Sequence, residues 1–587
     1  MTEKLQKRNN TLCLTVLGAV VALVAIRCLF GFDPDDESFY YTIPLRFLKG
    51  DCPIIDEWQV SQFYSVLLCP VVYLYTVMKG TTEGILLFGR FLYCAIAGLL
   101  SLWIYRSFRR RIRPFPALAC ALLYLFCARG NLMGLSYYKI YTAFLLIALL
   151  LYLRFEKHGA LTPGRWFLIG LFHGLACLCM PYFALLVLGL TLFLIIKRHQ
   201  VREAAAYILA PVLVLVLYLS IIFSHGYGIS DILTNFSYML EDPSYQMSIF
   251  QKAFRTIGGL LRQCFAGIPF VLYVFWCTIR KKELSSHWQL FALVSLVLMA
   301  ITGNGFVTPG ALYDQLIFLS LPLLFVRKEY RKDPALWHTG RTIYLYGILS
   351  AVLFWLGSDT RTSCLVTGFM IAQIGAMTML VASEEKKTTG EPEETAEQRT
   401  KEQKTAGKRL LPVLLAFCVF TAGFVRIFIV YRDESLPHLT NRITQGPAAG
   451  IFTEENKYKD YNAIYEGLED VVKTYGSDTT RIFISQKAPW AYLAADLKFG
   501  TCTAWAMQLS NWQQGIYYKT HPEMFPDIVI VLNDDVGSSS GFSSEVNPNA
   551  GNKREGFLWD QMQDKGYAAV VYDAFTAYVN PKITAVN

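Results

Sequence analysis

The chain has 587 residues, of which 54% are hydrophobic and only 17% are charged, and its mean hydropathy is +0.35. A soluble protein has roughly a quarter of its residues charged, so this composition excludes a soluble globular enzyme. The formal net charge of +9 does not indicate nucleic-acid binding, because the Lys and Arg residues stand in short clusters between apolar segments. We therefore expect an integral, α-helical, polytopic membrane protein.

The apolar segments are mostly about 15–24 residues long, close to the roughly 20 residues that a helix needs to cross the hydrocarbon layer. The first follows a basic N-terminus and is too long for a signal-peptide core, so we interpret it as a retained helix. About thirteen transmembrane helices are predicted, at residues 11–32, 84–106, 115–129, 138–154, 166–180, 182–196, 204–224, 256–279, 288–302, 311–326, 341–357, 363–382 and 410–431.

The distribution of basic residues predicts the topology. With the N-terminus in the cytoplasm, clusters such as 106–113, 197–202 and 327–332 all fall on the cytoplasmic side, as the positive-inside rule requires. The apolar segment Phe63–Met78 is short and contains Pro70. If it crossed the membrane, the later basic clusters would lie outside, so we predict a re-entrant or interfacial helix on the outer face. A multi-pass protein of a bacterial plasma membrane is expected.

The sequence predicts two domains, 1–431 in the membrane and 432–587 outside the cell. Within the first, residues 33–83 form an outer acidic and re-entrant loop, and residues 383–409 read as a disordered cytoplasmic linker because they are highly charged and lack apolar residues. Beyond residue 432 the apolar runs shrink to strand length and alternate with helical patterns, which predicts a small α/β domain. Its predicted strands are Arg481–Ser485, Asp527–Leu532 and Ala568–Tyr572.

The strongest chemical signal is the acidic loop after the first helix, where Asp33, Asp35, Asp36 and Glu37 follow one another closely. Carboxylates held close together raise one another's pKa, which suits a base that takes a proton near neutral pH. The alternative is an acidic outer loop without chemistry. Acidic residues contribute little to membrane orientation, however, and this favours the functional interpretation.

Charged residues also stand inside or at the outer ends of apolar segments: Arg27, Arg90, Lys139, Asp314 and Arg426. Ionisable groups in a membrane are costly and indicate function by default. For Arg27 and Arg426 we favour the alternative, in which the side chain extends to the membrane surface. Arg90 lies deeper in its helix, and a guanidinium suits a phosphate ligand. Lys139 and Tyr138 border another outer loop and are candidates for the same site.

This arrangement resembles the N-terminal part of the multi-pass GT-C glycosyltransferases, which include protein O-mannosyltransferases and the lipid A aminoarabinose transferase. In that pattern a first helix ends in an Asp-Glu pair, followed by an amphipathic stretch, a Pro-containing segment and a helix that opens with Arg. The counterparts here are Asp36-Glu37, Ser38–Lys49, Asp56–Tyr75 and Arg90.

The sequence departs from the GT-C pattern in two places. The second outer loop reads Ser136-Tyr137-Tyr138-Lys139 where relatives often carry an acidic residue, and Asp56-Glu57-Trp58 stands near the place of a His-Pro-Pro stretch. These departures concern the substrate more than the fold.

The resemblance implies inverting transfer of a sugar from a polyprenyl-phosphate donor to a glycan, lipid or protein acceptor at the outer face. It implies Asp36 as general base, assisted by Glu37 or Asp35, with Arg90 and Lys139 on the carrier phosphate. Further candidate substrate-binding residues are Asp56, Glu57, Tyr138 and Asp314. Carboxylates are preferred ligands of Mg²⁺ and Mn²⁺, so Asp35, Asp36 and Glu37 are also a candidate divalent-cation site.

Two other functions remain open at this point. A transporter would also have about a dozen helices but would usually show internal repeats, and none is evident in the sequence. A polymerase or ligase of cell-surface polysaccharide would share lipid-linked substrates. It would more often carry basic residues in a large outer loop, whereas the predicted loop 225–255 carries only Lys252 and Arg255.

Overall fold

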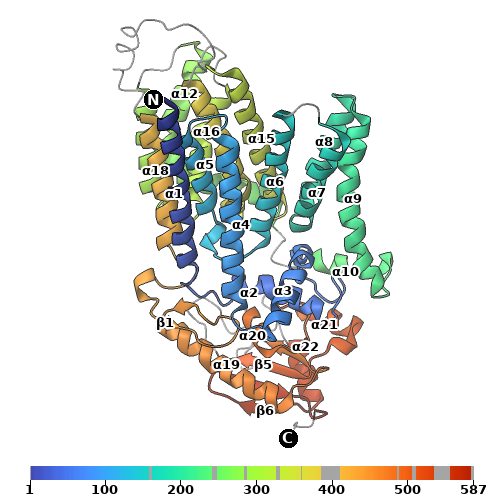
Figure 1. The fold of residues 1–587 in the computed structure, drawn as a ribbon. Helices are drawn as coiled ribbons and strands as arrows, with labels where there is room; N and C mark the ends of the chain where they lie inside the picture. The colour runs from blue at the N-terminus through green and yellow to red at the C-terminus, as the bar shows by residue number, and fades with distance from the viewer. Residues whose placement is uncertain are drawn as a thin grey trace, which may run out of the picture.

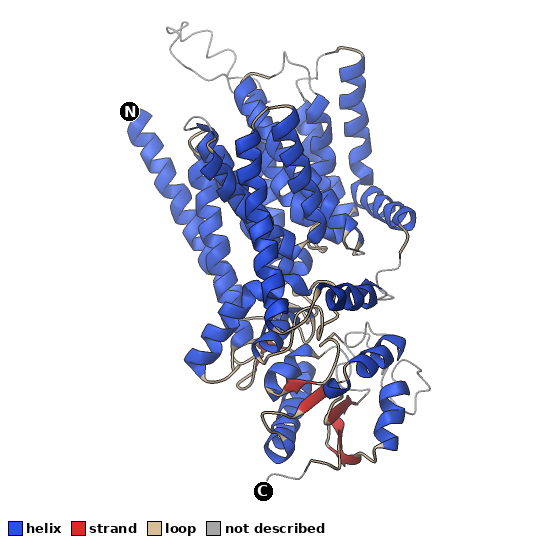
Figure 2. Ribbon diagram, turned by 90° about the vertical axis from the view of Figure 1, so that its right-hand side faces the viewer, coloured by secondary structure: helices blue, strands red, loops and turns tan. Residues whose placement is uncertain are grey.

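The computed structural model describes residues 2–157, 161–240, 247–282, 287–325, 331–358, 360–384, 410–484, 488–505, 511–533 and 556–583. A bundle of long helices carries a smaller region, built around a β-sheet, at the end opposite the N-terminus (Figure 1). The strands are confined to this smaller region (Figure 2). From residue 385 onward the predicted linker 383–409 lies outside the described residues.

Among the described residues, eight helical segments are long and apolar enough to cross a membrane. They are α1 (Thr2–Arg27), α4 (Ile85–Phe108), α6 (Tyr137–Lys157), α9 (Val201–Ser224), α11 (Ile249–Cys264) continued by α12 (Ile268–Ile279), α15 (Pro334–Leu356), α16 (Val366–Glu384) and α18 (Leu410–Phe428). Shorter apolar helices are α5 (Pro114–Phe126), α7 (Pro163–Cys179), α8 (Ala184–Ile196), α13 (Trp288–Thr302) and α14 (Ala311–Ser320). Each predicted membrane segment overlaps one of these helices, which confirms the helical membrane fold. The orientation of the termini stays a prediction.

Helices α15 and α16 approach each other closely, because glycines line both sides of their contact. A Cβ atom added at Gly347 would lie 2.3 Å from the backbone nitrogen of Ala372, and one at Gly375 would lie 2.4 Å from that of Tyr344. Small residues at such positions let membrane helices pack backbone against backbone. The two backbones therefore leave no space for a side chain at these glycines.

We expect Gly347→Ala to destabilise the protein by about 1–3 kcal/mol, because the added methyl group forces two backbones apart. Gly189→Ala is the matched control, since a Cβ at Gly189 meets no atom within 4 Å. Thermal unfolding of the purified protein in detergent measures both variants. Equal unfolding temperatures for the two would contradict the close packing of α15 on α16.

The segment after α1 forms two short helices, α2 (Asp36–Leu48) and α3 (Ser65–Lys79), which lie between the bundle and the sheet region (Figure 1). Helix α3 is one-sided: Leu68 and Val72 are buried, whereas Leu74 and Met78 are exposed. It ends at Gly80, which adopts a left-handed conformation with φ 75°. With 15 residues, α3 is not among the candidate membrane spans. A re-entrant or interfacial position for residues 63–78 stays a prediction.

The C-terminal region contains a five-stranded mixed sheet in the order β4-β3-β5-β7-β6. Strand β3 (Arg481–Ile484) is parallel to β4 (Lys498–Phe499) and β5 (Ile528–Leu532), and β7 (Phe575–Val579) is antiparallel to β5 and β6 (Ala568–Val571). A two-stranded ribbon, β1 (Asn441–Arg442) with β2 (Phe452–Thr453), precedes it. The helices are α19 (Glu455–Tyr475), α20 (Pro489–Ala495), α21 (Asn511–Thr520) and α22 (Gly556–Asp564). The three predicted strands coincide with β3, β5 and β6.

Both faces of this sheet are covered. Ile482 and Ile528 belong to a core shared with α19, while their neighbours Phe483 and Val529 point to a second core on the other face. Alternate residues of a strand point to opposite faces, so two apolar faces need two layers of cover. The sheet region is therefore a layered α/β unit, as the alternating pattern predicts.

Candidate active site

The acidic loop is fastened to the bundle by a buried ion pair between Arg90 of α4 and Glu37 of α2. Arg90 Nε lies 2.7 Å from Glu37 Oε1 and Arg90 Nη2 lies 2.5 Å from Glu37 Oε2, a bidentate arrangement. The guanidinium also donates to the carbonyls of Cys28 and Gly31, at 2.8 and 2.6 Å. Arg90 thus joins α4, the end of α1 and the start of α2. Its guanidinium is already bound to a carboxylate and two carbonyls of the protein.

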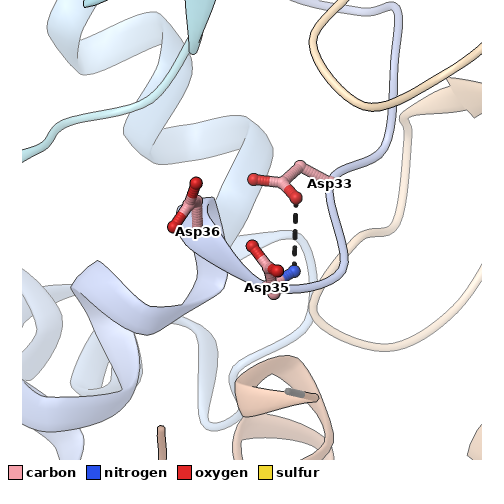
Figure 3. A group of neighbouring side chains, drawn as sticks. All are labelled: Asp33, Asp35 and Asp36. Atoms are coloured by element: carbon pink, nitrogen blue, oxygen red, sulfur yellow. Dashed lines mark hydrogen bonds between the residues drawn. The ribbon is translucent and has the colours of Figure 1, made fainter. Parts of the chain in front are cut away.

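Three other carboxylates of the loop form a compact acidic triad, Asp33, Asp35 and Asp36 (Figure 3). One oxygen from each lies within 4.8 Å of the others. The turn is held by the Asp33 carboxylate, which accepts from the backbone nitrogens of Asp35 at 3.3 Å and Glu37 at 3.0 Å. Burial raises the pKa of the Asp33 carboxyl well above its ordinary value, and the neighbouring Asp35 and Asp36 raise it further.

The acidic group in the structure differs from the predicted group of candidate metal ligands, Asp35, Asp36 and Glu37. Glu37 follows Asp36 directly on a helix, and consecutive helical side chains point about 100° apart. Both Glu37 oxygens are bound to Arg90. Asp33 takes the place of Glu37 in the acidic group.

Two further residues, Tyr431 and Arg432, bind the carboxylates of the triad. They were not among the residues predicted from the sequence. The Tyr431 hydroxyl donates to Asp36 Oδ2, and the Arg432 guanidinium contacts all three carboxylates. They lie about 400 positions away in the chain, in the connector between α18 and the sheet region. No pattern in the sequence signals this contact, because it depends on the tertiary fold.

Asp36 differs from its neighbours in accessibility. Its side chain is 25% exposed, whereas those of Asp33, Asp35 and Glu37 are 3%, 0% and 1% exposed. A general base must reach the proton that it takes. Among these four carboxylates, Asp36 alone is placed to meet a substrate.

An aromatic wall and one arginine stand beside Asp36. Tyr40, Tyr64 and Tyr137 lie with ring centroids 5.6–5.9 Å apart. Arg129, in the loop after α5, lies 3.9 Å above the Tyr138 ring and donates only from Nε, to Ser363 Oγ at 3.4 Å, among the described residues. A Cβ at the next residue, Gly130, would lie 2.7 Å from the Tyr431 ring. Arg129 therefore adjoins the glycine that packs on Tyr431, the tyrosine bonded to Asp36.

Burial raises the pKa of Tyr40 well above the ordinary value for tyrosine, the neighbouring Tyr137 and the negative charge of Asp36 raise it further, and the positive charge of Arg129 lowers it. Both charges thus act on one hydroxyl group. Arg129 and Tyr138 also line a narrow pocket between α4, α5, α6 and α16.

Lys139 lines the same pocket, but its ammonium group already has partners. It donates to the carbonyls of Leu132 and Gly134, at 2.5 and 2.8 Å, and lies 3.7 Å from the centre of the Tyr93 ring. A role for Lys139 on a phosphate stays a prediction. The structure shows that it holds the loop between α5 and α6.

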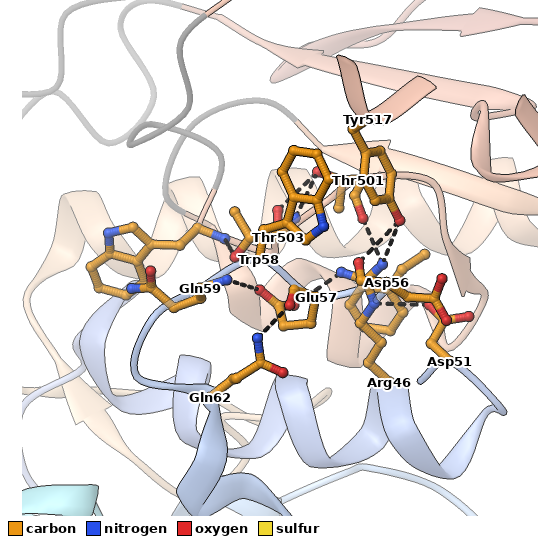
Figure 4. Close-up of polar contacts among 12 residues, drawn as sticks. Arg46, Asp51, Asp56, Glu57, Trp58, Gln59, Gln62, Thr501, Thr503 and Tyr517 are labelled. Carbon is orange, nitrogen blue, oxygen red and sulfur yellow. Dashed lines mark hydrogen bonds and ion pairs between the residues drawn. The ribbon is translucent and has the colours of Figure 1, made fainter. Parts of the chain in front are cut away.

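Asp56 and Glu57 lie away from the triad, in a second cluster around Arg46 (Figure 4). The buried Arg46 guanidinium contacts Asp51 at 2.8 Å and Glu57 at 2.9 Å, and it donates to the Thr501 carbonyl at 2.6 Å. The Asp56 carboxylate accepts from the backbone nitrogen of Cys52 at 2.5 Å. These acids join the first loop to the sheet region. Their predicted role in substrate binding stays a prediction.

Asp314 and Arg426 are both buried in the bundle. Asp314 Oδ1, on α14, has no hydrogen-bond partner among the described residues, and no described contact links Asp314 to the triad. Arg426 Nη1 donates to Asn131 Oδ1 at 2.7 Å and to the Leu132 carbonyl at 3.2 Å. Arg426 is 1% exposed and does not extend to the surface, contrary to the interpretation favoured by its sequence position.

Residues 70–223 match the family model described as dolichyl-phosphate-mannose-protein mannosyltransferase. The match includes Arg90, Arg129, Tyr138 and Lys139 but begins after the acidic triad. About a quarter of the chain is therefore similar to a family of membrane mannosyltransferases. No curated protein matches the chain.

Solved structures of the oligosaccharyltransferase of Archaeoglobus fulgidus are similar to this protein over 97% of its chain and 74% of theirs. One carries a tethered acceptor peptide with the NVT sequon (11% identity, TM-score 0.42), one an inhibitory peptide and a dolichol-phosphate (11%, 0.40), and one Zn and sulfate (11%, 0.41). At these TM-scores the similarity carries no conclusion about this chain.

The Arg90–Glu37 pair is expected to be a requirement for folding. Arg90→Met leaves the Glu37 carboxylate buried without its partner, which costs about 3–5 kcal/mol of unfolding free energy. The double variant Arg90→Met/Glu37→Met is expected to lose less than the sum of the two single changes.

Chemical unfolding in detergent micelles measures this cycle. Arg106→Met serves as the control, since Arg106 is exposed on the same helix. Strictly additive losses in the double variant would show that the two side chains do not act as a pair.

Proposed function

We propose that the chain transfers a sugar from a polyprenyl-phosphate donor to an acceptor at the outer face of the membrane, with Asp36 as general base. The observation that carries the assignment is the unequal exposure of the loop carboxylates. Asp36 is accessible and oriented by Tyr431 and Arg432, while Asp33, Asp35 and Glu37 are buried and occupied by their own contacts. Glu37 and Asp35 assist by holding the loop rather than by touching the substrate.

The proposed reaction is an inverting displacement at the anomeric carbon. The acceptor hydroxyl gives its proton to the Asp36 carboxylate as its oxygen bonds to the anomeric carbon. The bond from that carbon to the phosphate oxygen breaks, and its electron pair leaves with the carrier phosphate. One carboxylate is sufficient for this step because no covalent glycosyl intermediate forms.

For the leaving phosphate, the geometry favours Arg129 over Arg90. Arg90 is saturated by Glu37 and by two loop carbonyls, whereas the Nη1 and Nη2 groups of Arg129 have no hydrogen bond to a described residue. A guanidinium presents paired donors that suit phosphate oxygens and stabilises the charge that develops on them. Gly130, which follows Arg129, packs on Tyr431, and Tyr431 bonds Asp36, so donor and acceptor are proposed to meet between Arg129 and Asp36.

The acceptor is proposed to reach Asp36 from the side of the sheet region. Trp505 packs against Phe39 of α2 with ring centroids 4.8 Å apart, and the Thr42 hydroxyl donates to the Pro489 carbonyl at 2.9 Å. The sheet region therefore stands directly beside the helix that carries Asp36. This position suits a glycan, lipid or protein acceptor that arrives from outside the membrane.

Asp36→Asn is expected to lower kcat for sugar transfer by about 10²–10⁴-fold, the loss typical of a missing general base. Purified protein or membranes are assayed with radiolabelled polyprenyl-phosphate sugars. Asp478→Asn, an exposed change in the C-terminal region, is the control and should retain wild-type transfer. A folded Asp36→Asn protein that transfers at the wild-type rate would eliminate Asp36 as the base.

Arg129→Ala is expected to lower kcat/KM for the lipid donor by about 10²-fold, because the carrier phosphate loses a charged partner. Arg129→Lys should recover part of this loss, since it keeps the charge but not the paired donors. Arg202→Ala, an exposed change at the start of α9, is the matched control. An unchanged kcat/KM in Arg129→Ala would move the phosphate site elsewhere.

A further inference from the structure

The acidic triad already contains a positive charge, the guanidinium of Arg432. Its Nη1 atom is paired with Asp35 and lies 3.8 Å from Asp33 Oδ1, and its Nη2 atom lies 3.2 Å from Asp36 Oδ2. A single side chain thus reaches every carboxylate of the triad. The five N–H groups of a guanidinium suit such a multiple contact.

The backbone that presents Arg432 is strained and anchored on both sides. Arg432 has φ 50°, a left-handed conformation that is costly for a residue with a side chain. Lys457 Nζ donates to the Arg432 carbonyl. The next residue, Asp433, accepts from the backbone nitrogen of Phe32 at 2.7 Å and from the Thr453 hydroxyl at 2.7 Å. These contacts therefore hold the connector after α18 against the start of the acidic loop.

A divalent cation does not fit the triad beside this guanidinium. Mg²⁺ or Mn²⁺ would need the same carboxylate oxygens within its coordination shell. Two cationic groups at one set of oxygens would repel each other, and Asp35 and Asp33 are too deeply buried to turn toward a second position. Carboxylate oxygens suit a divalent metal, but here the Arg432 guanidinium already contacts them.

We propose that Arg432 is the resident cation of the triad and that a divalent cation binds there only when this side chain is removed. Arg432 then acts as a positioning residue, which neutralises the buried Asp35 and orients the accessible Asp36. Since Arg432 lies in the connector that follows α18, the same contact ties the sheet region to the base. The inference deepens the proposed function, because it concerns the site of Asp36.

The experiment measures binding of Mn²⁺ alone to the purified full-length protein by electron paramagnetic resonance, without any sugar donor. Arg432→Ala is expected to gain one Mn²⁺ site with an affinity at least about tenfold above that of wild type. The site should disappear in Arg432→Ala/Asp36→Asn. Arg442→Ala, which removes an exposed arginine from β1, is the matched control and should bind Mn²⁺ as wild type does.

Two results would overturn the proposal. One is a Mn²⁺ site in the wild-type protein that Asp36→Asn abolishes, a result that needs no Arg432 variant. The other is a folded Arg432→Ala protein that binds no more Mn²⁺ than Arg442→Ala. Thermal unfolding establishes whether Arg432→Ala is folded, and Arg432→Gln replaces it if it is not. Because no sugar is transferred in the assay, failure here is distinct from failure of the proposed reaction.

Discussion

The site depends first on the buried ion pair between Arg90 and Glu37. In a low-dielectric setting each charge would be costly alone, so the two side chains must meet for the loop to lie where it does. The same guanidinium bonds the carbonyls of Cys28 and Gly31, where α1 has ended and backbone acceptors need partners. The first residue of α2, Asp36, is thereby held at a defined height above the bundle.

The loop carboxylates bind different partners around the Arg90–Glu37 pair. Glu37 binds the bundle, Asp51 and Glu57 bind Arg46 and the sheet region, and Asp33 and Asp35 share Arg432. Asp36 keeps an accessible side chain. A loop with many acids therefore leaves Asp36 accessible, and its other acids are paired with Arg46 of the same loop or with the distant Arg90 and Arg432. Burial without such partners would be too costly for this many carboxylates.

Sequence patterns predicted the membrane helices, strands β3, β5 and β6 and the acidic loop, because hydrophobic length and alternation are local properties. They placed Asp36 but misjudged its neighbours. Arg90 has the position expected for a phosphate ligand, yet its guanidinium binds Glu37, the residue after Asp36. The direction in which α2 points the Glu37 side chain makes this contact possible, and the sequence alone does not show it. Tyr431, Arg432 and Arg129 were missed because their significance arises from tertiary contacts, which leave no periodic signal in the sequence.

The most direct test of the account is a structure of the protein with a polyprenyl phosphate bound. The account predicts that the phosphate contacts the Nη groups of Arg129, beside Asp36, while the Arg90–Glu37 pair and the contacts of Arg432 with the triad stay intact. A phosphate bound to Arg90 with the Glu37 pair broken would contradict it, because Arg90 would then serve the substrate and not the loop.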